Sequence, residues 1–250
     1  EALIDFTPTS DGTYFPNPGG APFNLAVCTA KYGCKTAFLG KLGKDAFGAL
    51  LLNTAKKHGV ATEGIVLDAE HVTTHAFLTL NSDGERDFVF CRKHGADAAI
   101  KREELNEELI KSTDVFHFGG LSLTDAPLAN TCRYAVELAK KAGATISFDP
   151  NYRAMLWESE EAFCNRVSAL LPLVDILKVS EEEAALLTGE EDMDKALIAL
   201  SGVPTVLITL GKNGALCCVR GESYAVSGYK AETVDTTGAG DIFFGTFLAQ

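Results

Sequence analysis

One stretch of the sequence reads TISF (Thr145–Phe148), EEAFCNRVSALL (Glu160–Leu171), ILKV (Ile176–Val179), EEEAALL (Glu181–Leu187) and TVLITL (Thr205–Leu210), with connecting segments between the runs. The three short runs are almost wholly apolar, whereas the two longer ones mix apolar and charged residues with helical periodicity. Strands without an apolar–polar alternation are typical of a sheet that helices cover on both faces, as parallel sheets are. The stretch therefore predicts an α/β fold with a mostly parallel sheet.

The same alternation continues toward the N-terminus. Further strands are expected at Leu3–Phe6, Thr36–Leu39 and Val115–Phe118. Further helices are expected at Pro22–Tyr32, Ala46–His58 and Leu128–Lys141. Short strands separated by helices of this length favour a layered α/β/α architecture.

Two segments depart from this pattern because they read as antiparallel hairpins. Thr74–Leu80 and Arg86–Cys91 flank the turn Asn81–Gly84, and a hairpin inserted into an α/β chain predicts a small second sheet that acts as a lid. Gly214–Val219 and Ser223–Val226 form the second candidate hairpin. We expect a single domain over residues 1–250, with lid elements near residues 11–18 and 73–92.

Composition limits the possible partners. The chain has 250 residues, 46% hydrophobic and 22% charged, which is the composition of an ordinary globular domain. Lys and Arg number 22 and Asp and Glu 34, so the formal net charge is −12. Such a charge disfavours nucleic acid and anionic membranes as partners. No stretch is suited to cross a membrane.

The cysteines and the ends of the chain bear on its location. The seven cysteines are odd in number and form no C-x-x-C pair, which favours reduced thiols in a cytoplasmic protein. No charged and then apolar leader opens the sequence, so nothing indicates secretion. The chain starts without Met and ends in a helical pattern at Phe247–Gln250, and we expect it to belong to a longer protein.

The segment DTTGAGDIFFG (Asp235–Gly245) carries the strongest chemical signal. Its glycines allow a tight turn, and the apolar run after them continues as a helix. A glycine-rich turn that enters a helix presents backbone N–H groups at the positive end of the helix dipole, which makes an anion site. Asp241 would lie beside that anion, although an Asp at this position can equally cap the helix. The spacing matches neither a Walker A loop nor a dinucleotide-binding G-x-G-x-x-G.

A second segment, GGAPFN (Gly19–Asn24), opens another helix. Paired glycines let the backbone approach a ligand, and the Asn24 amide both donates and accepts hydrogen bonds. A flexible turn is the alternative interpretation.

Asp5 is the one charge in the apolar run Ala2–Phe6, and an acid at a strand end points to the crevice where α/β proteins bind ligands. It can also be an ion-paired or capping residue.

Together these segments resemble the ribokinase-like, or PfkB-type, carbohydrate kinases. The resemblance is closest to the fructokinase branch and rests on five motifs that occur in the expected order: Ala2–Phe6, Gly19–Asn24, Asp149–Trp157, Lys178–Glu183 and Asp235–Asp241. It implies a three-layer α/β/α fold with a β-sheet lid. It also implies transfer of the γ-phosphoryl group of ATP to a sugar hydroxyl.

Residue roles follow from the resemblance position by position. Asp241 is implied to be the catalytic base, and the backbone N–H groups of Gly238, Ala239 and Gly240 the anion hole for the transferring phosphoryl group. The residues implied to bind the sugar are Asp5, Gly19, Gly20, Asn24, Arg92, Asn151 and Arg153. The residues implied to bind ATP are Ser180, Glu183, Thr209, Gly211 and Gly214.

Metal ions are also implied. Glu183 corresponds to an acid that helps to hold Mg²⁺ with the nucleotide phosphates, and Asp235 and Thr237 to a site for a monovalent cation such as K⁺. Ser180 stands where the wider family has Asn, as is common in the fructokinase branch.

D-Fructose is the expected substrate and fructose 6-phosphate the expected product. A homodimer through the lid is the expected assembly, because the hairpin exposes strand edges.

Two other functions stay open at this point. One is a 2-keto-3-deoxygluconate kinase, whose substrate carboxylate would require an additional cation in the pocket. The other is a kinase-derived binding or regulatory protein without turnover, which loss of Asp241 or of the glycine turn would indicate. Both features are intact. A nucleotide-binding oxidoreductase is disfavoured because no dinucleotide fingerprint follows the first strand.

Overall fold

The structure is a computed structural model that describes residues 1–80, 86–230, 232 and 236–250. The expected hairpin turn Asn81–Gly84 lies outside these residues. The chain divides into two compact units. Unit 1 comprises Glu1–Asn106 with Asp241–Gln250, and unit 2 comprises Glu107–Gly240. The expectation of a single domain stays a prediction.

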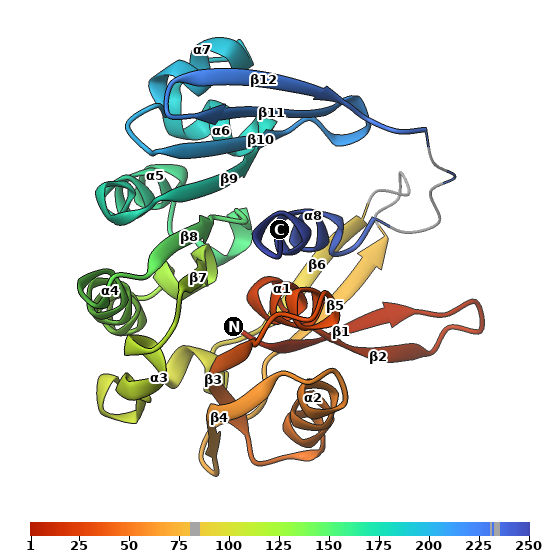
Figure 1. Cartoon of the computed structure of the whole chain (residues 1–250). Helices are drawn as coiled ribbons and strands as arrows, with labels where there is room; N and C mark the ends of the chain where they lie inside the picture. The colour runs from red at the N-terminus through yellow and green to blue at the C-terminus, as the bar shows by residue number, and fades with distance from the viewer. Residues whose placement is uncertain (81–85, 231, 233–235) are drawn as a thin grey trace. The chain divides into compact units, whose positions relative to one another are not determined.

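Unit 2 is built on a six-stranded sheet with the order β12-β11-β10-β9-β8-β7 (Figure 1). Its strands are β7 (Val115–Gly119), β8 (Thr145–Asp149), β9 (Ile176–Ser180), β10 (Thr205–Thr209), β11 (Gly214–Val219) and β12 (Glu222–Ser227). Strands β7 to β10 pair in parallel, and β11 and β12 extend the sheet as an antiparallel hairpin. The predicted parallel sheet and the second hairpin are confirmed.

Helices on one side of this sheet keep its apolar strands from water. They are α4 (Ala126–Ala142), α5 (Glu160–Ser168), α6 (Glu181–Thr188) and α7 (Met193–Ala199), preceded by the short helix α3 (Glu107–Lys111) (Figure 1). The middle three residues of β8, β9 and β10 are all buried, which accounts for their continuous apolar runs. Helix α7 was not predicted, because seven residues show too little periodicity.

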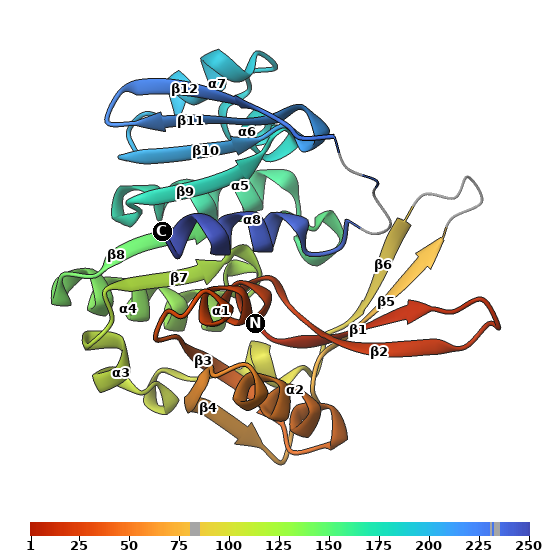
Figure 2. The same ribbon diagram turned by 45° about the vertical axis from the view of Figure 1, so that its right-hand side comes forward.

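Unit 1 contains a four-stranded sheet with the order β2-β1-β5-β6. Its strands are β1 (Leu3–Pro8), β2 (Tyr14–Gly19), β5 (His75–Leu80) and β6 (Arg86–Cys91). Figure 2 shows these strands projecting beyond α1 and α2 of the same unit, and their role as a lid stays a prediction. Strand β2 tolerates Pro16 and Pro18 because it is an edge strand, where a missing N–H costs least.

The rest of unit 1 is a two-stranded parallel sheet of β3 (Ala37–Gly43) and β4 (Ala61–Asp68), with helices α1 (Ala21–Lys31) and α2 (Ala46–Lys57). The predicted strand at Thr36–Leu39 is longer than expected, and its partner β4 was not predicted. Strand β4 carries Gly64 and an isolated Glu63, which weaken its apolar pattern.

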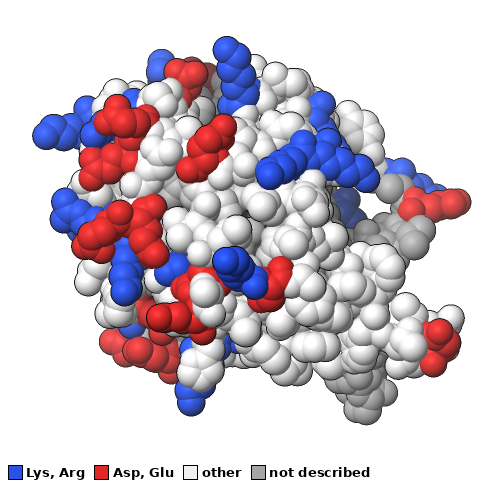
Figure 3. All heavy atoms as spheres, turned by 90° about the horizontal axis from the view of Figure 1, so that it is seen from below, with Lys and Arg blue, Asp and Glu red and all other residues white. Residues whose placement is uncertain are grey.

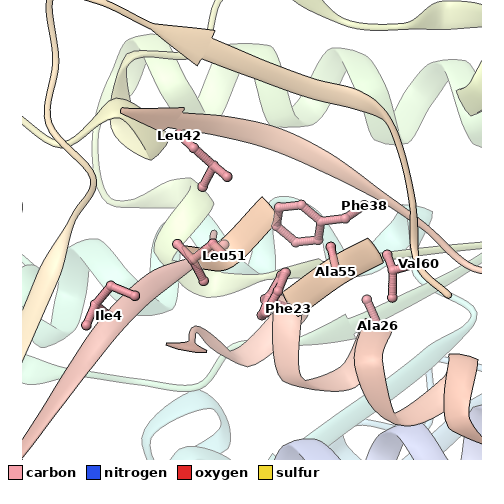
Figure 4. Close-up of a cluster of buried hydrophobic side chains, with 9 residues drawn as sticks. Ile4, Phe23, Ala26, Phe38, Leu42, Leu51, Ala55 and Val60 are labelled. Atoms are coloured by element: carbon pink, nitrogen blue, oxygen red, sulfur yellow. The ribbon is translucent and has the colours of Figure 1, made fainter. Parts of the chain in front are cut away.

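A buried hydrophobic cluster fastens these elements together. Its members are Ala2, Ile4, Phe23, Ala26, Phe38, Leu42, Leu51, Ala55 and Val60 (Figure 4). The rings of Phe23 and Phe38 meet edge to face, with centroids 5.4 Å apart. The cluster joins β1 to α1, so it fixes the positions of the two elements that carry Asp5 and Asn24.

Charges of both signs lie next to one another on the face drawn in Figure 3. Exposed pairs such as Arg133–Glu137, 2.8 Å apart, contribute little to stability. The pair between Lys41 Nζ and Asp68 Oδ2, also 2.8 Å apart, differs because each side chain is only 7% exposed. Among the residues that the structure describes, none of the helices has the length and apolar composition needed to cross a membrane.

The Lys41–Asp68 pair predicts an acid-sensitive contribution to stability. The hydrogen bond from Lys41, together with those from the backbone of Glu70 and His71, holds the pKa of the Asp68 carboxyl below its ordinary value. The charged form is therefore favoured in the folded state, and its contribution is complete above the unfolded pKa and lost as the pH falls. Asp68→Asn removes this titration. We expect the stability difference between wild type and variant to shrink by about 1 kcal/mol between about pH 5 and pH 3.

Urea unfolding of both proteins across this pH range measures the effect. Parallel curves of unfolding free energy against pH would show that Asp68 is not the titrating group.

Candidate active site

The first part of the site lies where β1 passes the loop before α1. The Asp5 carboxylate lies so close to Gly19 that a Cβ on Gly19 would collide with its Oδ2. Gly20 has φ +101°, and a Cβ there would approach Glu1 O to 2.9 Å. Gly19 is thus required by the Asp5 side chain and Gly20 by the backbone of Glu1 and Ala2, and Asp5 lies beside the loop before α1.

Asn24 and Asp241, 217 residues apart in the sequence, meet in unit 1. Asn24 Nδ2 donates a hydrogen bond to Asp241 Oδ2 at 2.8 Å. Helix α8 (Ala239–Leu248) packs its unit 1 residues against α1, where Gly245 leaves room for the Cys28 side chain. Asp241 is the third residue of α8 and lies within its first turn, and its role as the base stays a prediction. Asn24 orients this carboxylate.

Arg92 is buried at the end of β6, with 7% of its surface exposed. Its Nε donates to Asp97 Oδ2 at 2.9 Å, and the other oxygen of Asp97 accepts a hydrogen bond from Thr74 Oγ1. Asp97 and Thr74 therefore fix the guanidinium of the predicted substrate-side arginine. The sequence interpretation missed both residues, although an Asp in the Gly95–Asp97 turn after an Arg was a usable signal.

The turn before α8 is the predicted anion hole. Gly238 has φ +74°, and the Ala239 N–H donates to Thr236 O at 3.1 Å. This hydrogen bond closes the turn. The Ala239 N–H is therefore already bonded to Thr236 O, whereas the resemblance implies that it belongs to the anion hole. The first N–H groups of a helix have no partner within the helix, so the Gly240 N–H is suited to bind an anion. Thr237 precedes this turn, and Asp235 lies outside the described residues.

Three parallel strands of unit 2 end at predicted site segments. Strand β8 ends at Asp149, β9 at Ser180 and β10 at Thr209. The carboxyl ends of parallel strands meet at one edge of a sheet, where α/β proteins bind ligands. The structure therefore brings the predicted ATP-binding segments after β9 and β10 to the same edge as the predicted sugar-binding segment after β8.

Ser180 and Glu183 form a capping box at the start of α6. Ser180 Oγ accepts from the Glu183 N–H at 3.2 Å, and Glu183 Oε2 accepts from the Ser180 N–H at 2.8 Å. Glu183 Oε1 accepts from the Tyr152 N–H at 2.6 Å, which ties the segment after β8 to α6. Burial raises the pKa of the Tyr152 hydroxyl.

The segment after β8 is unusual in its backbone. Asn151 has φ +44°, a conformation in which Asn is among the more tolerant residues, and its N–H donates to Asp149 Oδ1 at 3.1 Å. Arg153 Nη1 donates to Tyr152 O at 2.8 Å. Both predicted residues are partly exposed, and their proposed contacts with substrate remain predictions.

The loop after β10 contains the other predicted nucleotide residues. Thr209 Oγ1 donates to Val179 O at 3.3 Å. Gly211 and Gly214 have φ +54° and +112°, and a Cβ on Gly214 would collide with the backbone of Val226. A Cβ on Gly211 would meet nothing within 4 Å, so glycine is favoured there by the positive φ and not by a lack of space.

Mg²⁺ fits these residues in a limited way. Among the described residues, no three His, Cys, Asp or Glu side chains gather as ligands. Both oxygens of the buried Glu183 already accept backbone hydrogen bonds but keep lone pairs for metal-bound water. Mg²⁺ usually retains several waters and binds through one or two carboxylates and substrate phosphates. These residues therefore suit a Mg²⁺ ion that keeps several waters, and not an ion whose ligands all come from the protein.

The arrangement defines a class of protein. A carboxylate lies in the first turn of a helix that a glycine turn introduces, and polar groups collect at the carboxyl edge of a parallel sheet. Positioned N–H groups stabilise a transferring phosphoryl group, and the carboxylate can accept the proton of an attacking hydroxyl. These are the parts of a phosphotransferase that acts on an alcohol.

Comparison with known proteins gives the same class. Residues 3–250 match the pfkB family of carbohydrate kinases. Fructokinase-1 from Oryza sativa subsp. japonica is 43% identical over 100% of this chain and 80% of its own length. The chain belongs to the pfkB family of carbohydrate kinases.

Solved structures agree on the fold. A fructokinase with bound ATP from Xylella fastidiosa superposes with a TM-score of 0.93 at 33% identity, over 100% of this chain and 78% of that one. A fructokinase double mutant from Vibrio cholerae O395, solved with fructose, ADP and a potassium ion, gives 0.91 at 32% identity, over 100% and 80%. The predicted ribokinase-like α/β fold is confirmed.

Proposed function

We propose that the protein transfers the γ-phosphoryl group of ATP to the 6-hydroxyl of D-fructose, giving fructose 6-phosphate and ADP. The hydrogen bond between Asn24 and Asp241 is the observation that carries this proposal. It links the glycine-pair motif with the DTTGAGD motif and orients the Asp241 carboxylate, which we propose as the acceptor of the hydroxyl proton. Fructose as the substrate is supported by the relatives that are named fructokinases.

The reaction needs positioning more than covalent chemistry. Asp5 would accept hydrogen bonds from sugar hydroxyls, and Arg92 would hold the sugar from the lid side. Asp241 would take the proton as the sugar oxygen attacks the γ-phosphorus. The bond from that phosphorus to the β–γ bridging oxygen then breaks, and ADP leaves.

The nucleotide half of the proposal rests on unit 2. Ser180, Glu183, Thr209, Gly211 and Gly214 would receive ATP, and the N–H groups of Gly238 and Gly240 would bind the phosphoryl oxygens. Mg²⁺, when bound, neutralises phosphate charge, and Glu183 would hold it through water. We also propose a K⁺ site to which Asp235 and Thr237 contribute.

The product distinguishes this function from its alternatives. Phosphorus NMR of the reaction of the purified protein with fructose and ATP should show a phosphate ester on carbon 6. An ester on carbon 1 would contradict the proposed position of transfer. Turnover only with 2-keto-3-deoxygluconate would contradict the proposed substrate. Nucleotide binding without any turnover would support the silent-module alternative.

Assembly and location are also proposals. A homodimer through the four-stranded sheet is supported by apolar side chains on its edge strands, since Tyr14, Phe15 and Val89 are 43%, 59% and 51% exposed. Light scattering at micromolar concentration should give twice the monomer mass. A fully active monomer would contradict the dimer.

A cytoplasmic location is supported by the seven free cysteines.

A further inference from the structure

A lysine lies at a buried position of strand β9. Lys178 is 6% exposed and stands between Leu177 and Val179, both of which are fully buried. A buried ammonium group requires a partner, because its desolvation is costly. Lys178 Nζ meets Asp149 Oδ2 at 3.0 Å, and the two side chains are 8% and 4% exposed. Asp149 is held in turn by the N–H of Asn151.

The same ammonium group lies against the glycine turn of unit 2. A Cβ built on Gly240 would lie 3.0 Å from Lys178 Nζ, so the backbone of Gly240 and the ammonium are immediate neighbours. Gly240 is the second residue of α8. The N-terminus of a helix carries partial positive charge, and a cation beside it is electrostatically unfavourable. An anion that contacts both groups would be attracted by each of them.

We propose that Lys178 is a further catalytic residue, whose ammonium binds the γ-phosphoryl group that is transferred, and that Asp149 is the positioning residue that holds it. This inference rests on the proposed function. In the transfer, the bond from phosphorus to the sugar oxygen forms and its bond to the β–γ bridging oxygen breaks. The hydroxyl proton passes to Asp241. Lys178 stays protonated and neutralises charge on the phosphoryl oxygens.

A purely structural role makes a different prediction. If the Lys178–Asp149 pair only joined β9 to β8, its loss would affect the binding of ATP and ADP alike. A cation that touches the γ-phosphate discriminates between them, because only ATP carries that group. The difference in affinity between the two nucleotides is therefore the decisive quantity.

The test is calorimetric titration, without sugar, of the purified protein with ADP and with a non-hydrolysable ATP analogue. Lys178→Met should weaken binding of the ATP analogue by about 10- to 100-fold, the usual scale of a charged hydrogen bond, and ADP binding by less than about threefold. Lys178→Arg should recover much of the loss. Equal losses for both nucleotides, or no loss for the ATP analogue, would overturn the proposal.

Lys41→Met is the matched control, since Lys41 is also a buried lysine paired with an aspartate and has no part in the site. It should leave both affinities unchanged. If Lys178→Met does not fold, Lys178→Gln with Asp149→Asn removes both charges together and should show the same selective loss.

The outcomes separate the two proposals. A wild-type protein that binds both nucleotides but does not phosphorylate fructose would refute the proposed substrate. The role of Lys178 would then be decided by whether Lys178→Met weakens binding of the ATP analogue more than binding of ADP. A wild-type protein that binds neither nucleotide would refute both.

Discussion

Replacing Asp241 by Asn should lower kcat by about 10²- to 10⁴-fold, the usual scale for loss of a general base. A sugar hydroxyl is a weak nucleophile at neutral pH, so the carboxylate that takes its proton lowers the barrier. Asn nearly preserves the shape of Asp and can still accept the hydrogen bond from Asn24 Nδ2. Folding and ATP binding should therefore survive while turnover is lost.

Asp192→Asn is a suitable control for this variant. Asp192 is a true helix cap, whose Oδ1 accepts from the N–H groups of Asp194 and Lys195 at the start of α7. Because Asn caps a helix about as well as Asp, this change should leave both stability and kcat unaltered. A folded Asp241→Asn protein that keeps more than about a tenth of wild-type turnover would contradict the assignment of the base.

Asp5→Ala should weaken sugar binding by roughly 2–4 kcal/mol, which corresponds to an increase in the fructose KM of about 30- to 1,000-fold. The expectation counts two hydrogen bonds from neighbouring sugar hydroxyls to a charged acceptor, which are stronger than neutral ones. Asp5 lies against Gly19 beside the start of α1, and the buried residues Leu3 and Ile4 anchor its strand.

The KM for ATP of the same variant is its internal control and should change little, because the proposed nucleotide residues belong to unit 2. An unchanged fructose KM would show that Asp5 is structural. A parallel increase in both KM values, together with a lower melting temperature, would indicate that unit 1 had been disturbed as a whole.

The fold was predictable where most residues of a strand are buried. The apolar runs at β8, β9 and β10 gave the parallel sheet because helices exclude water from them. Strands β2 and β4 carry no such signal. The first contains two prolines that only an edge position permits, and the second contains Gly64 and Glu63. Their pairing depends on neighbours that are distant in the sequence.

The candidate site was predictable from local motifs but not from its contacts. The glycine turn before α8 identified Asp241, yet no local pattern shows that Asn24 donates to it across 217 residues. Asp97 and Thr74, which fix Arg92, were missed for the same reason. Lys178 was quoted only as part of a motif, although a lysine inside a buried strand requires a partner and thereby indicates one.

The central claim is that this chain phosphorylates fructose from ATP. Its most direct test is a coupled assay of ADP release by the purified protein, with fructose, glucose, ribose, 2-keto-3-deoxygluconate and nucleosides offered in turn. We expect kcat/KM to be highest for fructose, and ADP release to fall to background without a sugar. A higher kcat/KM for any other member of the panel, or ADP release that is independent of sugar, would contradict the claim.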